Sequence, residues 1–149
     1  MTSTTHALIG TVIAARIGNP ALAIPIALAS HFIVDAIPHW DTAYHRAQNS
    51  KERFIITSAT DVLLGFVLSY LLIVLFFPAT NIFYAFLIII VAQLPDWITA
   101  PYLFLNWNFP PFNLSYELGK KFDSSIGLPW GFVNQVVVVV ALILVAKIF

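Results

Sequence analysis

The chain has 149 residues, of which 60% are hydrophobic and only 9% are charged, and its formal net charge is zero. A mean hydropathy of +0.89 excludes an ordinary soluble domain, and the lack of basic tracts argues against nucleic acid as a partner. There is no cysteine, which excludes disulfides, thiolate metal ligands and cysteine nucleophiles. These properties predict a membrane protein.

Apolar runs separated by turn residues predict a series of helices along the chain. The predicted helices cover 7–17, 20–37, 54–77, 82–94 with a continuation over 97–105, and 130–149. The first run is too short to cross a membrane alone, because a spanning helix needs about 20 residues. The fourth is interrupted at Pro95-Asp96, which predicts a broken helix or a helix followed by an interfacial piece. The fold class is therefore all-α, an integral membrane helical bundle of four to five membrane helices.

A less apolar segment, residues 106–128, precedes the final helix over 130–149 in this single membrane domain of residues 1–149. Phe109-Pro110-Pro111-Phe112 cannot continue a helix. The segment from Leu114 to Phe122 is predicted to form a short amphipathic turn, with two lysines near lipid headgroups. The segment is either an interfacial connection or a lid over a site.

The distribution of basic residues predicts the orientation of the chain. Five of the seven lie in the segments 40–53 and 106–128, whereas only Arg16 and Lys147 lie on the opposite side. The positive-inside rule makes the richer side cytoplasmic, so we expect an inner-membrane protein with a cytoplasmic N-terminus.

An internal repeat relates residues 5–41 to residues 60–98. Thr5 to Gly10 parallels Thr60 to Gly65, and Ile37 to Trp40 parallels Leu94 to Trp97. Two tandem helical hairpins placed in parallel would bring four ligand-type residues to one depth near the cytoplasmic face. These residues are His6, His39, Asp61 and Asp96. The alternative is that apolar helices resemble each other by chance.

Ionisable residues inside apolar runs are costly and usually functional. His31 and Asp35 are four positions apart and share a helix face, and Pro38 ends or bends that helix and turns His39 back over the bundle. The predicted metal ligands are His6, His31, Asp35, His39, Asp61 and Asp96, with Asp41 and His45 as outer candidates. His and Asp suit one or two divalent ions: zinc or manganese, or magnesium on a carboxylate-rich subset. Asp41 or His39 would serve as a general base.

Each candidate also has a structural interpretation. His31 and Asp35 would then be a hydrogen-bonded pair between helices, and Asp96 would cap a helix. Neighbouring hydroxyl side chains would hold Asp61. Three further acidic residues are expected to be solvated loop charges, namely Glu52, Glu117 and Asp123.

Three of these motifs resemble one family. The Thr-His start of the first helix, the ending His-x3-Asp-x2-Pro-His and the late Leu-Pro-Asp are similar to the membrane-bound metal-dependent hydrolases of bacterial inner membranes. The resemblance covers residues 5–41 and 93–97. It implies a metal and the ligands His6, His31, Asp35, His39 and Asp96.

The leading function is metal-dependent hydrolysis at the cytoplasmic membrane face, with a lipid phosphoester as substrate. The expected partners are membrane lipid and a second copy of the chain, and not nucleic acid. Proton or cation transport through the buried Asp and His residues is the first alternative. A non-catalytic structural subunit is the second.

Overall fold

The computed structural model describes residues 1–44 and 46–148, and their regular structure is helical. The main helices are α1 (Ser3–Arg16), α2 (Pro20–Asp35), α3 (Lys51–Phe76), α4 (Ile82–Leu105), α5 (Phe112–Phe122) and α6 (Trp130–Ile148). The prediction of an all-α fold is confirmed. His45, an outer ligand candidate, and Phe149 lie outside the described residues.

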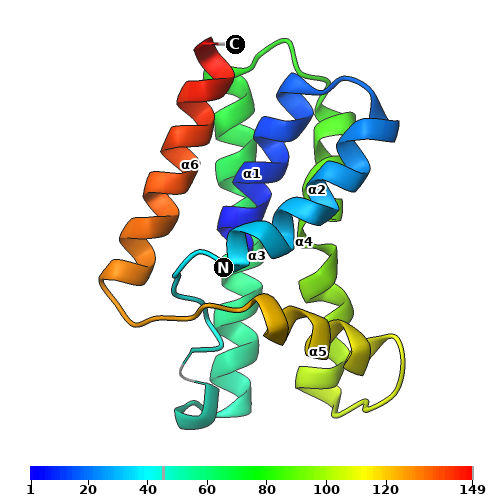
Figure 1. Cartoon of the computed structure of the whole chain (residues 1–149), viewed down its shortest axis with the longest axis vertical. Helices are drawn as coiled ribbons and strands as arrows, with labels where there is room; N and C mark the ends of the chain where they lie inside the picture. The colour runs from blue at the N-terminus through cyan, green and yellow to red at the C-terminus, as the bar shows by residue number, and fades with distance from the viewer. Residues whose placement is uncertain (45, 149) are drawn as a thin grey trace.

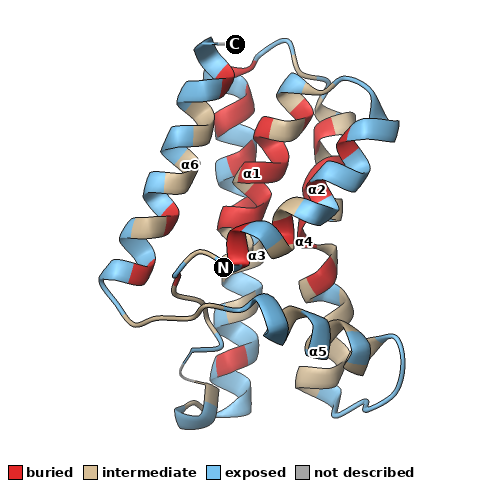
Figure 2. Cartoon of the chain, in the orientation of Figure 1, coloured by how far each residue is buried: buried red, intermediate tan, exposed pale blue. Residues whose placement is uncertain are grey.

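Helix α1 is the centre of the bundle. It packs against α2, α3, α4 and α6, and most of its residues are buried, as Figures 1 and 2 show. The core beside it consists largely of alanine and isoleucine, including Ala7, Ile88 and Ile89. α3 and α4 extend beyond the start of α1, and α5 lies across the end of α4 (Figure 1). This arrangement leaves the first residues of α1 facing the space between α2, α4 and α5.

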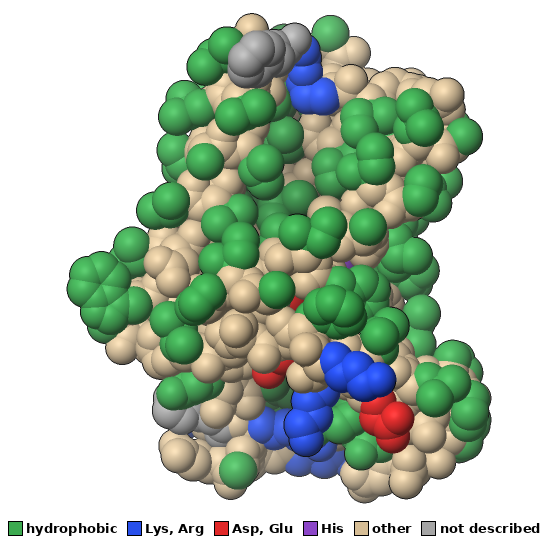
Figure 3. Space-filling model, in the orientation of Figure 1, with side chains coloured by type: hydrophobic (Ala, Val, Ile, Leu, Met, Phe, Trp, Pro, Cys, Tyr) green, Lys and Arg blue, Asp and Glu red, His purple; other side chains and the backbone are tan. Residues whose placement is uncertain are grey.

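Three helices, α3, α4 and α6, are long and apolar enough to cross a membrane by length and composition. Their outer faces carry many exposed large apolar residues, and the space-filling view shows hydrophobic side chains over most of the upper part of the molecule (Figure 3). α1 and α2 have only 14 and 16 residues. The structure therefore gives three candidate spans, with a shorter helical pair packed against them.

Most helix boundaries follow local sequence chemistry. Asn19 accepts a hydrogen bond from the N–H of Ala21 at 2.9 Å and caps α2, whose first residue is Pro20. α2 ends at Asp35, three residues before Pro38, as the proline predicts. The predicted interruption of the fourth helix is wrong, because α4 is continuous through Pro95. The packing of α1, α2 and α5 against α4 supports the helix where the proline lacks its N–H.

Two glycines allow α1 to approach its neighbours closely. A Cβ atom at Gly10 would lie 2.9 Å from the Cβ of Ala92 in α4, and one at Gly65 would lie 3.1 Å from the Cβ of Ala7. These glycines occupy equivalent positions in the predicted repeat. The close contacts of α1 with α4 at Gly10 and with α3 at Gly65 therefore depend on a residue without a side chain.

Gly131 at the start of α6 is packed most tightly, and we expect Gly131→Ala to destabilise the protein. The new Cβ would lie 2.5 Å from the backbone nitrogen of Trp40 and 2.8 Å from the backbone carbon of His39, neither of which can rotate away. Overpacking of this kind costs about 1–3 kcal/mol of unfolding free energy, measurable by denaturation in mixed detergent micelles. Gly119→Ala is the matched control, because its Cβ would meet nothing within 4 Å. Equal stability of the two variants would contradict the prediction.

Candidate metal centre

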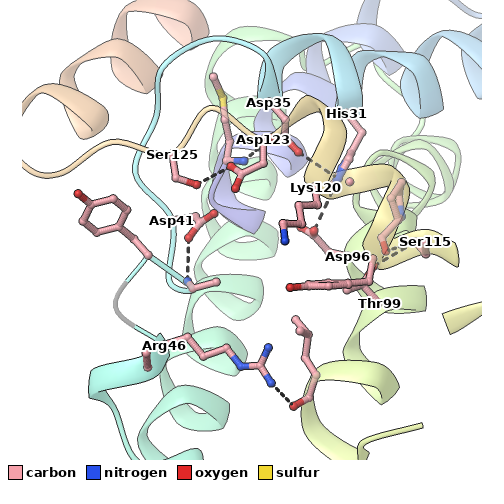
Figure 4. A pocket seen from close by; sticks show the side chains of 18 residues that line it. His31, Asp35, Asp41, Arg46, Asp96, Thr99, Ser115, Lys120, Asp123 and Ser125 are labelled. Carbon is pink, nitrogen blue, oxygen red and sulfur yellow. Dashed lines mark hydrogen bonds and ion pairs between the residues drawn. The ribbon is translucent and has the colours of Figure 1, made fainter. Parts of the chain in front are cut away.

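Two groups of His and Asp residues lie beside one cavity of about 700 Å³. The inner group consists of His6, His31, Asp35 and Asp96, and the outer group consists of His39, Asp41 and Asp123. Figure 4 shows the carboxylates of both groups turned toward the same space. Five of the seven residues line the cavity directly, while His6 and His39 are buried behind it.

The inner group comes from three helices. His6 lies in the first turns of α1, which begins in the middle of the bundle, and His31 and Asp35 share one face near the end of α2. Asp96 follows Pro95 in α4, the helix that packs against both. The i, i+4 interpretation of His31 and Asp35 is confirmed, with 3.4 Å between His31 Nε2 and Asp35 Oδ2.

The spacing of the inner atoms is that of ligands about one metal ion. His6 Nε2 lies 3.2 Å from Asp35 Oδ1, and His31 Nε2 lies 3.4 Å from Asp35 Oδ2 and 3.6 Å from Asp96 Oδ1. Zinc bonds of about 2.0–2.2 Å place neighbouring ligand atoms of a tetrahedral site about 3.3–3.6 Å apart. The side chains therefore need little movement to hold a divalent ion.

In two of the histidines, a hydrogen bond at Nδ1 determines which ring nitrogen carries the proton. His31 Nδ1 lies 2.9 Å from the carbonyl oxygen of Ala92, and His39 Nδ1 lies 2.8 Å from that of Ile37. A carbonyl only accepts, so Nδ1 carries the proton, and in the neutral ring Nε2 presents a lone pair. Metal-binding histidines commonly donate their second N–H to a carbonyl in this way.

Two buried imidazole nitrogens face carboxylate oxygens without a hydrogen bond. His6 Nε2 and His39 Nε2 are buried and have no hydrogen bond, although carboxylate oxygens lie 3.2 and 3.4 Å away. Such unpartnered polar atoms are unfavourable unless a proton or a metal ion joins them to the oxygens. The donor set of two imidazoles and two carboxylates fits zinc and manganese.

Asp35 joins the two imidazoles of the inner group. Its Oδ1 faces His6 and its Oδ2 faces His31, while the two rings stack at 3.9 Å with an angle of 19° between their planes. The α-amino group of Met1 also contacts Oδ1. Asp35 therefore links the two imidazoles, so that both rings and this carboxylate belong to one group.

The outer group is built by the turn after α2. The chain leaves the helix before Pro38, and the backbone of His39 pairs with the segment before α6, donating to Ser124 O at 3.2 Å and accepting from Ile126 N at 2.6 Å. This pairing brings Asp123 Oδ1 to 3.4 Å from His39 Nε2. Asp41 Oδ2 lies 3.7 Å from the same nitrogen. The expectation that Asp123 is only a solvated loop charge is wrong. No local signal in the sequence announces this non-local pairing.

Asp61 lies in neither group. Its carboxylate accepts hydrogen bonds from Ser3 N at 2.7 Å and Thr4 N at 3.1 Å, and from the Thr4 hydroxyl at 2.7 Å. The side chain thus satisfies free N–H groups at the start of α1. The assignment of Asp61 as a metal ligand is corrected: its oxygens are already occupied, and it fixes the helix that carries His6. The neighbouring hydroxyl groups proposed to hold it do not do so; Thr57, for example, donates to Arg53 O.

The four repeat-related residues do not converge at one centre. His6 and Asp96 meet in the inner group, His39 belongs to the outer group, and Asp61 caps α1. The proposed repeat therefore pairs residues of different function. His6, His31, Asp35 and Asp96 come together as predicted, and so do His39 and Asp41.

Two basic residues complete the cavity wall. Arg46 lies in the loop before α3, where its guanidinium donates to Leu103 O at 3.0 Å, and Lys120 lies on α5. α5 also lines the cavity through Ser115, whose hydroxyl donates to Pro95 O at 3.0 Å. Figure 4 shows both cationic side chains on the cavity side. The segment expected as a connection or a lid is thus one wall of the cavity.

Comparisons with family models, curated proteins and solved structures find no match to the chain. The geometry of the two groups and of the adjoining cavity is therefore the basis for inferring a function.

Proposed function

We propose that the protein is a metal-dependent hydrolase of phosphoesters at the cytoplasmic face of a bacterial inner membrane. One observation carries the proposal: buried imidazole nitrogens face carboxylate oxygens at the spacing of metal ligands, beside a cavity with two basic side chains. The resemblance of the ligand motifs to membrane-bound metal-dependent hydrolases supports the same reaction class.

The inner group holds the metal in this proposal. Divalent ions there would polarise a phosphoryl oxygen and provide a nucleophilic water at neutral pH. His6, His31, Asp35 and Asp96 would hold the ion. The hydrogen bond from His31 to Ala92 O holds that imidazole in position.

The outer group moves the proton. Asp41 lines the cavity, and its Oδ1 is held by the N–H of Ala43 at 2.8 Å while its Oδ2 faces His39. Asp123 is the most exposed carboxylate of this group, with 43% of its side chain accessible, so protons can exchange with water there. His39 Nε2 is therefore placed to take a proton and return it to the leaving oxygen through Asp41.

The basic side chains select the substrate charge. Arg46 and Lys120 line the same cavity as the metal-facing carboxylates, and a guanidinium or ammonium group recognises a phosphate oxygen by a charge-assisted hydrogen bond. A neutral ester or amide offers these cations no charged group to recognise. A phosphoester satisfies them.

The placement of charge supports a membrane-face site. α3 has 26 residues and is about 39 Å long, longer than the roughly 30 Å hydrocarbon core of a bilayer. Its first turns, with Lys51 and Arg53, therefore protrude at the end where the cavity lies, and Figure 3 shows most Lys and Arg side chains of that view gathered there. By the positive-inside rule this end is cytoplasmic.

The distribution of polar groups favours a site over a transport path. Beyond Thr11, the core around the second half of α1 is made of residues such as Ala14, Ile73 and Ala85. A path for protons or cations would need polar groups at those depths as well. The described core offers an apolar barrier there.

The test is hydrolysis by protein purified in detergent. We expect release of p-nitrophenol from bis(p-nitrophenyl) phosphate, loss of that activity after dialysis against a chelator, and recovery on adding back zinc, manganese or magnesium. The proposal would be overturned if the protein bound no metal and stayed inactive after each of the three ions was added. The inactivity would have to hold for both bis(p-nitrophenyl) phosphate and phosphatidic acid.

A further inference from the structure

We propose that the substrate is a phospholipid whose acyl chain lies in a groove between α3 and α4 while its phosphate occupies the polar cavity. This inference rests on the proposed function and names its substrate class. The proposed occupant of the groove is a lipid that enters laterally from the bilayer. A soluble phosphoester that reaches the cavity from water is the competing outcome.

The groove is a separate hollow of about 250 Å³ with mainly apolar walls. The first half of α3 and the second half of α4 supply most of its lining. Its apolar walls include Phe54, Ile55, Ala59, Val62, Trp97 and Phe104. Such side chains give an acyl chain an apolar environment like that of the bilayer, so the chain can lie there without exposure to water.

The groove and the polar cavity share a wall. Both are lined by Asp41, Ala43, Asp96, Thr99 and Leu103. Asp96 is an inner-group ligand candidate, and Asp41 belongs to the outer group. An acyl chain in the groove therefore reaches the carboxylates of Asp41 and Asp96. The same carboxylates face the polar cavity, where the phosphate is proposed to bind.

Arg46 marks the boundary between the two hollows. Its guanidinium lies 5.6 Å from the centre of the Phe54 ring, which lines the groove, and donates to Leu103 O, which belongs to both walls. A cation placed between an apolar groove and a polar cavity meets a phospholipid where its phosphate joins its tails. A small soluble phosphoester has no group to fill the apolar side.

The groove opens where lipid is present. α3 and α4 are both candidate membrane spans, and Ile55 and Trp97 are 40% and 36% exposed at its edge. The groove also lies at the end of α3 that carries Lys51 and Arg53, the level at which headgroups and acyl chains meet. A lipid can therefore slide in without leaving the bilayer.

The test uses a phosphatidic acid with a photoreactive diazirine on its acyl chain, at low mole fraction in phosphatidylcholine nanodiscs. We expect cross-links concentrated in peptides of residues 54–62 and 97–104, reduced at least fivefold by excess unlabelled phosphatidic acid. Ala59→Trp fills the groove and should lower this labelling at least fivefold. Leu71→Trp, on the exposed face of α3 outside the groove, should leave it unchanged. Ile55→Trp replaces Ala59→Trp if the latter does not fold.

The outcomes separate the two proposals, because the metal content and bis(p-nitrophenyl) phosphate turnover are measured on the same samples. Groove labelling that competes and that the tryptophan removes supports the lipid substrate. Uniform labelling of α3, α4 and α6, in protein that binds metal and hydrolyses the soluble ester, overturns the groove and leaves the hydrolase standing. Competable groove labelling in a metal-free, inactive protein overturns the hydrolase and the role of the lipid as its substrate, and leaves the groove as a lipid-binding site.

Discussion

Asp35→Asn is expected to strip the divalent ions from the protein. Asp35 gives one oxygen to each imidazole of the inner group, and asparagine offers one neutral oxygen in place of two charged ones. If two ions share this carboxylate, both are lost, and the metal content falls at least tenfold. Elemental mass spectrometry on detergent-purified protein measures the ions per chain. The wild type should carry at least one.

Asp61→Asn is the matched control for this experiment. It makes the same chemical change in another partly buried carboxylate that bonds to the start of α1 and faces no described imidazole. The amide oxygen of asparagine can still accept from one of the two backbone N–H groups there, so most of the wild-type metal content should remain. Loss of metal in Asp61→Asn but not in Asp35→Asn would reverse our assignment and restore the ligand set expected from the repeat.

Asp41→Asn is expected to lower turnover by about 10²–10⁴, the usual contribution of general acid–base catalysis. Because Asp41 belongs to the outer group, the metal bound by the inner group should remain. The measurement is kcat for bis(p-nitrophenyl) phosphate, with metal content determined on the same sample. His39→Ala should give the same pattern, since its Nε2 faces Asp41.

Glu117→Gln is the control for charge alone, because Glu117 is an exposed carboxylate of α5 that does not line the cavity. Its turnover should match that of the wild type. If Asp41→Asn or His39→Ala instead loses metal together with activity, the outer group binds an ion, and its role in proton transfer is wrong.

The sequence predicted the parts of the structure that local chemistry determines. Continuous apolar runs located the helices, Gly18-Asn19-Pro20 located the break before α2, and Pro38 located its end. The i, i+4 spacing of His31 and Asp35 placed both on one face. Within the described residues, the inner group therefore follows largely from residue type, spacing and the cost of burying charge.

The errors arose where distant segments meet. Asp123 reaches His39 only because the backbone after α5 pairs with the turn after α2, about 85 positions earlier, and no periodicity encodes that pairing. Asp61 looked like a ligand because it interrupts an apolar run, yet the free N–H groups of a different helix use it. Residue type alone does not distinguish a carboxylate that binds metal from one that caps a helix.

The short, buried α1 has a consequence for how the protein is made. At about 21 Å it cannot cross the hydrocarbon core alone, and Thr5, His6 and Thr11 would be exposed to lipid without its neighbours. α2 follows α1 directly along the chain, but α3 and α4, which pack most extensively against α1, are synthesised later. A nascent chain without α4 lacks Asp96, so the inner group is complete only after the later helices have emerged.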